Sequence, residues 1–159
     1  MRPGRIWEIY GKRRAWLSAV SGENYRLPTE AEWEAASRGP KGLRYPWGQN
    51  WEPARANTIE GRVLKPSPVG AYAAAGKSRF KAEDQAGNVW ELTSSLDPPY
   101  PYRRENSEKP EVEGERVMRG SSWDFNRRGA RCACCNRNIP GLFINGVGFR
   151  VFSPGPARP

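Results

Sequence analysis

The amino-terminal part of the chain carries apolar residues at the spacing of an amphipathic helix. Between residues 6 and 20 they are interspersed with Arg and Lys: Ile6, Ile9, Tyr10, Trp16, Leu17 and Val20. Residues three and four positions apart share one face of a helix, so this stretch predicts a helix with an apolar face. Ser21-Gly22 interrupts the pattern, and we expect the helix to end there.

A second, shorter helix is predicted to begin after Thr29. Thr29 and Glu32 have the spacing of a capping box, in which the threonine hydroxyl accepts a hydrogen bond from a backbone N–H and the glutamate accepts one from the threonine backbone. The helix is expected to end near Arg38-Gly39. The side chains expected to face the core are Trp33, Ala36 and Ala35.

The next clear pattern is that of a strand, and it follows a long loop region. Residues 40–70 are rich in turn-forming residues; Trp47 is expected in the core, and Asn57 is expected to hold loop backbone through its amide. After the Gly87-Asn88 turn the side chains alternate as in a strand. One face is expected to hold Val89, Glu91 and Thr93, and the other Trp90 and Leu92. Residues 97–115 are rich in Pro and charge and predict a mobile loop.

Residues 116–151 combine apolar residues at strand spacing with residues that share no chemistry. The apolar positions expected to fill the core are Val117, Met118, Trp123, Ala130, Ala133, Val147, Phe149 and Val151. Acidic, aromatic, basic, thiol and aliphatic side chains lie between them. Short strands joined by Asn, Gly and Pro turns form a platform on which side chains can be displayed. We therefore interpret this region as a display surface and the rest of the chain as its support.

The composition is that of a folded protein with limited regular structure. The chain has 159 residues, seven of them Trp, which suits one domain with a core. Gly and Pro contribute 17 and 15 residues, which indicates many turns. No apolar run approaches the roughly 20 residues of a membrane span, and no hydrophobic signal core follows Met1.

The formal net charge of +9 lies mostly in the carboxyl-terminal part. Residues 116–159 contain eight Arg, no Lys and one acidic residue, Asp124, which leaves +7. A basic excess is typical of surfaces that bind nucleic acid or other polyanions. No recognised nucleic-acid motif accompanies it, and Arg in preference to Lys also suits a GC-rich genome. Nucleic acid is therefore not the favoured partner.

The three cysteines, Cys132, Cys134 and Cys135, lie within four positions. This is not the pattern of a secreted disulfide framework, so a reduced cytosolic setting is the default expectation. On a strand, Cys132 and Cys134 would share a face, and two thiolates there suit a soft ion such as copper(I). The alternative is one buried thiol and two incidental ones. Without His, the chain offers too few ligands for zinc.

Short motifs occur in one order from about Trp16 to Val151. They are Tyr25–Glu34, Tyr45–Gly48, Arg55–Asn57, Pro68–Gly70, Gly87–Glu91, Arg119–Trp123 and Gly148–Arg150. This series resembles the formylglycine-generating-enzyme (sulfatase-modifying factor) family. The resemblance implies a C-type-lectin-like α+β fold, with short helices, small antiparallel sheets and much loop. It also implies that residues 1–159 form a single such domain, lacking the usual N-terminal part.

One departure from the family bears on activity. Members that make formylglycine hold copper(I) between two cysteines five residues apart, just after the Gly-Gly-Ser motif. The corresponding window here, residues 121–131, contains no cysteine. Cys132 lies on the following strand, where some members have a structural cysteine. The resemblance therefore predicts that the chain is not an enzyme and needs no catalytic cofactor.

A different branch of the same fold is more similar at the end of the chain. In the variable proteins of diversity-generating retroelements, a Trp after Gly-Ser precedes scattered variable positions and then Gly-Phe-Arg-Val, as at Trp123 and residues 148–151. Their scaffold is fixed, and exposed side chains are rewritten by mutagenesis at adenines. The residue types this produces occur here at Asp124, Phe125, Arg127, Cys134, Cys135, Ile139, Gly141, Leu142, Phe143, Ile144 and Asn145. The resemblance implies that residues 116–151 are a variable ligand-display region.

The function predicted from these features is the binding of a protein or another surface ligand. The expected contact residues are Asp124, Phe125, Arg127, Cys134, Cys135, Asn136, Ile139, Leu142, Phe143 and Ile144, supported from below by Trp123. Aromatic and apolar anchors beside Arg are typical of binding hot spots. The alternatives are a formylglycine-generating or related copper oxidase and an inactive homologue of it.

Asn88 and Glu91 are candidates for a structural calcium site. The enzymes of the resembled family hold Ca²⁺ near the Gly-Asn-x-Trp-Glu motif, and side-chain oxygens suit this ion. In the alternative, Asn88 bonds the turn backbone and Glu91 pairs with an Arg.

Overall fold

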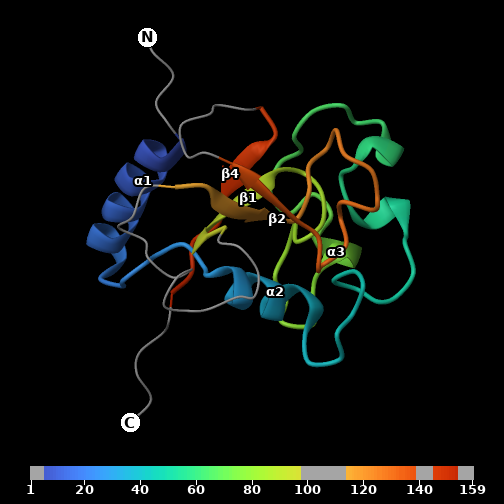
Figure 1. Ribbon diagram of the computed structural model, residues 1–159, viewed down its shortest axis with the longest axis horizontal. Helices are drawn as coiled ribbons and strands as arrows, with labels where there is room; N and C mark the ends of the chain where they lie inside the picture. Colours follow the sequence, from blue (N-terminus) through green and yellow to red (C-terminus); the bar gives the residue numbers. More distant parts are fainter. Residues whose placement is uncertain (1–5, 98–113, 139–144, 154–159) are drawn as a thin grey trace.

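A four-stranded sheet lies at the centre of the computed structural model, which describes residues 6–97, 114–138 and 145–153 (Figure 1). Its strands are β1 (Trp90–Leu96), β2 (Arg116–Arg119), β3 (Cys135–Asn138) and β4 (Val147–Phe149), in the order β3-β2-β1-β4. The β1/β2 and β2/β3 pairs are antiparallel, and the β1/β4 pair is parallel. The expected α+β class is confirmed, with a mixed sheet in place of wholly antiparallel ones.

The helices lie around this sheet, and the remainder is mostly loop. They are α1 (Ile6–Ser21), α2 (Glu30–Arg38) and α3 (Ala73–Gly76), with 3₁₀ turns η1 (Pro53–Arg55) and η2 (Ile59–Gly61). The α2 helix packs against β1 and β2, and α1 packs against β4. Among the described residues, no helix has the length and apolarity needed to cross a membrane.

The α1 helix has the predicted bounds, but its apolar residues occupy two faces. Tyr10 is buried: its hydroxyl oxygen accepts a 3.1 Å hydrogen bond from the backbone N–H of Leu27, and its ring packs edge-on against Phe149. Ile9, Trp16 and Val20 are exposed. These three are seven and four residues apart, so the helical period places them together on the outer face.

The α2 helix begins with the predicted capping box. Thr29 Oγ1 accepts from the Glu32 backbone N–H at 3.2 Å, and Glu32 Oε2 accepts from the Thr29 N–H at 2.8 Å. Trp33 is buried as expected, whereas Ala35 is exposed and Ala36 only half-buried. Ser37 is buried instead and donates to Cys132 Sγ at 3.0 Å. The inward position that was predicted for Ala35 or Ala36 is therefore taken by Ser37. Its burial is possible because Cys132 Sγ accepts a hydrogen bond from its hydroxyl.

Acid sensitivity of the α2 cap is a first testable consequence. The hydrogen bond from Arg26 lowers the pKa of Glu32 from 4.5 to about 2, aided by the bonds from Thr29. A lowered carboxyl pKa stabilises the folded state above the unfolded pKa, and this stability is lost as pH falls through the folded pKa. We expect Glu32→Gln to lower the free energy of unfolding by about 1 kcal/mol at pH 7, a value reduced for solvent screening.

Urea unfolding of both proteins between pH 7 and pH 2 measures this effect. The difference between wild type and Glu32→Gln should shrink as pH falls from 4.5 towards 2. Glu115→Gln, at an exposed carboxylate, provides the matched control. A difference that does not depend on pH would contradict the assignment.

Two buried clusters form the described core. The larger contains Tyr10, Leu27, Trp90, Leu92 and Met118. The smaller contains Ala56, Ala86 and Ala130, with Trp47 and Trp51 packed half-buried at its edge. Strand β1 alternates as predicted, but both of its faces are buried, including Glu91 and Thr93.

The apolar residues predicted to fill the core between Val117 and Val151 are buried to different degrees where the structure describes them. Val117, Met118 and Ala130 are in the core, and Trp123, Val147, Phe149 and Val151 are half-buried. Ala133 is exposed, so its predicted core position is wrong. It lies in a turn, because β3 begins only at Cys135, and strand alternation does not apply to it.

Candidate ligand-binding surface

A buried ion pair joins three distant segments beneath the carboxyl-terminal region. Glu91 Oε1 accepts from Arg150 Nη2 at 2.5 Å, and Glu91 Oε2 accepts from Arg150 Nε at 2.5 Å and from Trp33 Nε1 at 2.6 Å. Arg150 Nη2 also donates to the carbonyl of Glu83 at 3.0 Å. Burial alone would lower the pKa of Arg150, but the Glu91 charge more than offsets it and raises the pKa. The pair therefore fixes α2, β1 and the segment after β4 relative to one another.

The Gly87-Asn88 turn is the second fixed point. Asn57 Nδ2 donates to the carbonyl of Lys65 at 2.9 Å, which confirms the predicted role of Asn57 in holding loop backbone. Asn88 Oδ1 accepts from the Ser67 N–H at 2.9 Å, and the Asn88 carbonyl accepts from the Trp123 N–H at 3.0 Å. Through these bonds the turn positions the start of the segment after β2.

These contacts do not fit a calcium site made by Asn88 and Glu91. Both carboxylate oxygens of Glu91 already accept N–H groups, and Asn88 Oδ1 is held by the Ser67 backbone. Within the described ranges no group of three or more His, Cys, Asp or Glu side chains is placed to hold a metal ion. An ion at this position would have to displace the Arg150 guanidinium.

A melting experiment tests the calcium prediction. The contacts of Asn88 and Glu91 lead us to expect the same melting temperature in excess calcium and in chelator. A real site would add about 2.7 kcal/mol to the free energy of unfolding at a hundredfold excess over Kd. A clear upward shift in calcium, lost in Glu91→Gln, would establish the site.

The segment from Trp123 to Ala130 has a fixed backbone and outward side chains; we call it the display loop. The Phe125 carbonyl accepts from the Ile59 N–H at 3.1 Å, and the Arg127 N–H donates to Glu60 Oε1 at 2.8 Å. Ala130 is fully buried in the smaller core cluster and anchors the far end. The predicted contact residues Asp124, Phe125 and Arg127 are exposed, and Trp123 is half-buried. The supporting role of Trp123 stays a prediction.

Phe125 is the apolar centre of the display loop. Its side chain is 44% exposed, and its ring packs edge-on against Trp90 with centroids 5.4 Å apart. Asp124 and Arg127 flank it. An exposed aromatic ring held in place by a core tryptophan costs little entropy on binding, which suits an anchor.

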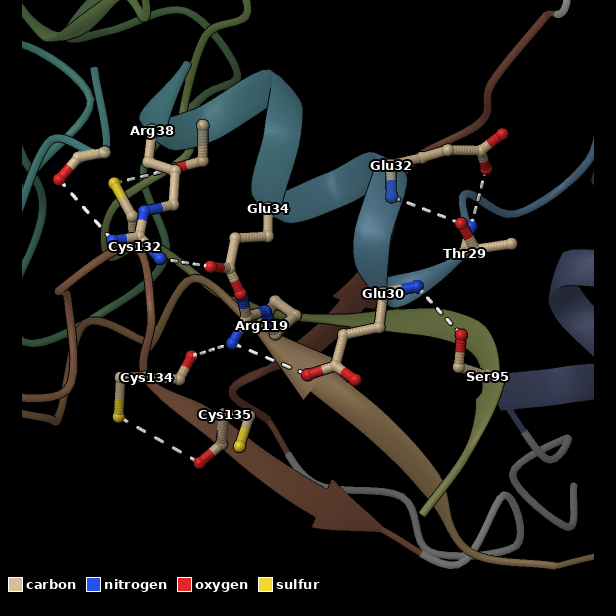
Figure 2. Close-up of polar contacts among 12 residues, drawn as sticks. Thr29, Glu30, Glu32, Glu34, Arg38, Ser95, Arg119, Cys132, Cys134 and Cys135 are labelled. Carbon is tan, nitrogen blue, oxygen red and sulfur yellow. Dashed lines mark hydrogen bonds and ion pairs between the residues drawn. The ribbon is translucent and has the colours of Figure 1, made fainter. Parts of the chain in front are cut away.

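A second group of predicted contact residues lies on β3, which is an edge strand of the sheet. Cys135, Asn136 and Arg137 are exposed. The start of this strand is held by Arg119, which is buried: Nη1 donates to the Cys134 carbonyl at 3.1 Å and Nη2 pairs with Glu34 (Figure 2). The predicted contact set thus divides into the display loop and β3, which have different neighbours. Ile139, Leu142, Phe143 and Ile144, like most of the predicted 97–115 loop, lie outside the described residues.

The cysteines are not arranged as a pair of ligands. Cys132 is buried in a turn and accepts from Ser37, and Cys134 is half-buried ahead of β3. The prediction that strand alternation places their side chains on one face is therefore wrong, because Cys132 is not on a strand. Burial raises the pKa of the Cys132 thiol, which keeps it protonated at neutral pH. The alternative interpretation of the cysteines was one buried thiol and two incidental ones, and Cys132 is that buried thiol.

Sequence reasoning did not identify the platform on which the display loop rests. Glu60 accepts from both the Arg127 N–H and the Thr58 hydroxyl. Burial alone would raise the pKa of Glu60, but these hydrogen bonds lower it below its ordinary value. Its sequence context carries no signal for this role, since η2 is a single 3₁₀ turn within a loop.

Comparison with known proteins accounts for this arrangement. Residues 10–153 match the family model of the sulfatase-modifying factor enzyme 1-like domain. The chain is 41% identical to hercynine oxygenase of Mycolicibacterium thermoresistibile over 124 residues, which cover 69% of the chain and 26% of that protein. It is 34% identical to the inactive Cα-formylglycine-generating enzyme 2 of Mus musculus over 164 residues, covering 92% of the chain and 47% of that protein.

A solved structure with a similar fold is that of a variable protein, the type of protein that the end of this sequence resembles. Treponema denticola variable protein 1 superposes with a TM-score of 0.68 at 25% identity, covering 81% of this chain and 47% of that one. The chain thus spans less than half the length of each of these three proteins. The family resemblance and the C-type-lectin-like fold are confirmed. This chain belongs to the sulfatase-modifying factor family, of the formylglycine-generating-enzyme type.

Proposed function

We propose that this chain is a ligand-binding protein that presents changeable side chains on a formylglycine-generating-enzyme-like scaffold. One observation carries the proposal: the display loop is bonded to the scaffold through its main chain, while the side chains of Asp124, Phe125 and Arg127 are exposed. Asp124 Oδ1 accepts from the Ser122 hydroxyl and the Phe125 ring contacts Trp90, and these contacts are separate from the main-chain bonds. Replacing these side chains leaves the supporting main-chain bonds intact. The similarity to Treponema denticola variable protein 1 supports the same reading.

The partner we propose is a protein surface or another surface ligand with an apolar spot. Phe125 provides an aromatic anchor, and Arg127 and Arg128 beside it favour acidic groups around that spot. Nucleic acid is a weaker proposal, since a basic face without a reading motif supports only salt-sensitive, non-specific binding. The three free cysteines favour a reducing compartment such as the cytoplasm.

Tolerance of substitution is the first test. We expect Phe125→Ala to lower the free energy of unfolding by about 1 kcal/mol, the value of its contact with Trp90. Leu92→Ala, at a core residue, should cost about 2–5 kcal/mol. A library randomised at positions 124, 125 and 127 should stay largely folded, whereas one randomised at 90, 92 and 118 should not. An equal loss of folded variants in both libraries would exclude a display role for positions 124, 125 and 127.

The gene itself provides the second test. A diversity-generating retroelement predicts a near-copy of the 3′ end that differs at adenines, beside a reverse transcriptase gene. Substitutions between related copies should fall at the display positions. Variation spread evenly between the display loop and the core would contradict the proposal.

A formylglycine-generating or related copper oxidase is the alternative, and the observation in favour of an enzyme is that the relatives include one named hercynine oxygenase. Its test is a peptide that bears the sulfatase cysteine motif, incubated with copper-loaded protein in air and analysed by mass spectrometry. We expect no conversion, because residues 121–131 include no thiol to hold copper(I). Conversion of the thiol to an aldehyde, abolished in Cys134→Ala, would establish the oxidase and exclude our proposal.

A further inference from the structure

A cavity of about 400 Å³ opens between the carboxyl-terminal end of α2, residues 42–49 and the turn before β3. Its charged lining consists of Arg38, Arg44 and Arg131, and Gln49 and Cys134 also contribute. None of the described Asp or Glu residues lines it. The cavity is therefore lined by three arginines that come from three separate segments.

Two of these guanidinium groups have no acidic partner in the described part of the chain. Arg38 is neutralised by Glu34, whose Oε1 lies 2.5 Å from Arg38 Nη1 (Figure 2). Arg44 and Arg131 are exposed and form no ion pair within the described residues. Arg131 Nε donates to the Arg128 carbonyl at 2.9 Å, which restricts its guanidinium. The Arg44 carbonyl accepts from the Cys132 N–H at 2.8 Å, which fixes the backbone of that segment.

The end of α2 opposes anion binding only in part. A helix carboxyl terminus disfavours anions through its free carbonyls. Here the Ala35 carbonyl accepts from the Gly39 N–H and the Arg38 carbonyl accepts from the Leu43 N–H, both at 3.0 Å. Two of the last four carbonyls of α2 are therefore occupied, which reduces the opposing effect at the cavity.

We propose that this cavity binds a small organic anion with carboxylate or phosphate groups, held chiefly by Arg44 and Arg131. Planar guanidinium groups bind both kinds of oxyanion in a bidentate manner. The volume lies near the lower end of the range for small-molecule sites, so the ligand is larger than a single inorganic ion. Of the predicted contact residues, only Cys134 lines this cavity, so the site is distinct from the display loop.

Calorimetric titration with citrate, at an ionic strength held constant with sodium chloride, tests the site. We expect binding with a Kd of about 1 mM or tighter, and weaker binding of inorganic phosphate, which fills less of the cavity. Arg44→Gln and Arg131→Gln should each weaken citrate binding about tenfold. Arg14→Gln, which removes an exposed charge on α1 outside the cavity lining and outside the display loop, should change binding less than about twofold. Unchanged melting temperatures of the variants will confirm that they are folded.

Alkylation of the thiols provides a second readout. Cys134 lines the cavity, whereas Cys135 is exposed beyond it. Citrate should slow the reaction of iodoacetamide with Cys134 and leave that with Cys135 unchanged, as followed by mass spectrometry of the intact and digested protein. Absence of citrate binding, or equal weakening by Arg14→Gln, would overturn the proposal. Protection of both thiols alike would show that citrate does not occupy the cavity, and would also overturn it.

Discussion

Arg150→Met is expected to lower the free energy of unfolding by about 3 kcal/mol or more. The substitution leaves the Glu91 carboxylate buried, with Trp33 as its one remaining side-chain donor among the described residues. An uncompensated charge of this kind typically costs about 3–5 kcal/mol, because its desolvation is no longer offset. Methionine retains most of the aliphatic stem, so lost packing contributes little. Urea unfolding at pH 7 measures the effect.

A double substitution separates the lost charge pair from other effects of the change. Glu91→Gln combined with Arg150→Met removes the orphaned charge, so the double variant should be more stable than the sum of the single effects predicts. Arg137→Met provides the control, since its ion pair with Asp97 is at the surface, with 67% of the Arg137 side chain exposed. That variant should lose less than about 1 kcal/mol. If Arg150→Met also lowered the free energy of unfolding by less than about 1 kcal/mol, the Glu91–Arg150 pair would not hold the scaffold together.

Gly87→Ala is expected to lower the free energy of unfolding even more than Arg150→Met does. Gly87 has φ of +76°, and a Cβ there would lie 2.1 Å from the Asn57 carbonyl oxygen and 2.8 Å from its carbon. The left-handed conformation alone costs a side-chain-bearing residue about 1–2 kcal/mol, and the clash with the backbone adds to this. The Asn57 and Asn88 segments must then separate. We expect a total loss above about 3 kcal/mol, or no folded protein.

Gly11→Ala is the matched control for that change. Gly11 lies within α1, where a Cβ would meet nothing within 4 Å. The same chemical substitution should therefore increase stability by up to about 1 kcal/mol, through helix propensity and a restricted unfolded chain. Thermal unfolding of both variants gives the comparison. A folded Gly87→Ala protein with wild-type stability would mean that the turn is not closed as described.

These two scaffold predictions also bear on the proposed function. The Gly87-Asn88 turn contacts the start of the display loop, since the Asn88 carbonyl accepts from the Trp123 N–H. The Glu91–Arg150 pair ties β1 to the segment after β4. Substitutions at these supports should destabilise the whole surface, whereas substitutions of Asp124 or Phe125 should leave it intact. This contrast is what a display scaffold requires.

Local patterns determined several elements by themselves. The bounds of α1, the capping box at Thr29 and the strand after Gly87-Asn88 depend on interactions between residues close in sequence. Helical periodicity, a cap and a left-handed turn are each encoded within a few residues. The exposure of Asp124, Phe125 and Arg127 was also predicted, from their lack of shared chemistry and from the resemblance to variable proteins. The sequence alone also determined the absence of a cysteine pair in residues 121–131.

Only the tertiary structure decided which chain segments meet. The sequence offered an unspecified Arg as one possible partner of Glu91. The fold buries Glu91 because Trp33 and Arg150, 58 and 59 residues away along the chain, provide donors for its carboxylate. Ala133 reads as a core residue and is exposed because β3 starts two residues later. The platform at Glu60 and the arginine cavity likewise combine segments that share no local pattern. Whether a polar group is buried depends on partners brought by the fold, and spacing along the chain carries no record of them.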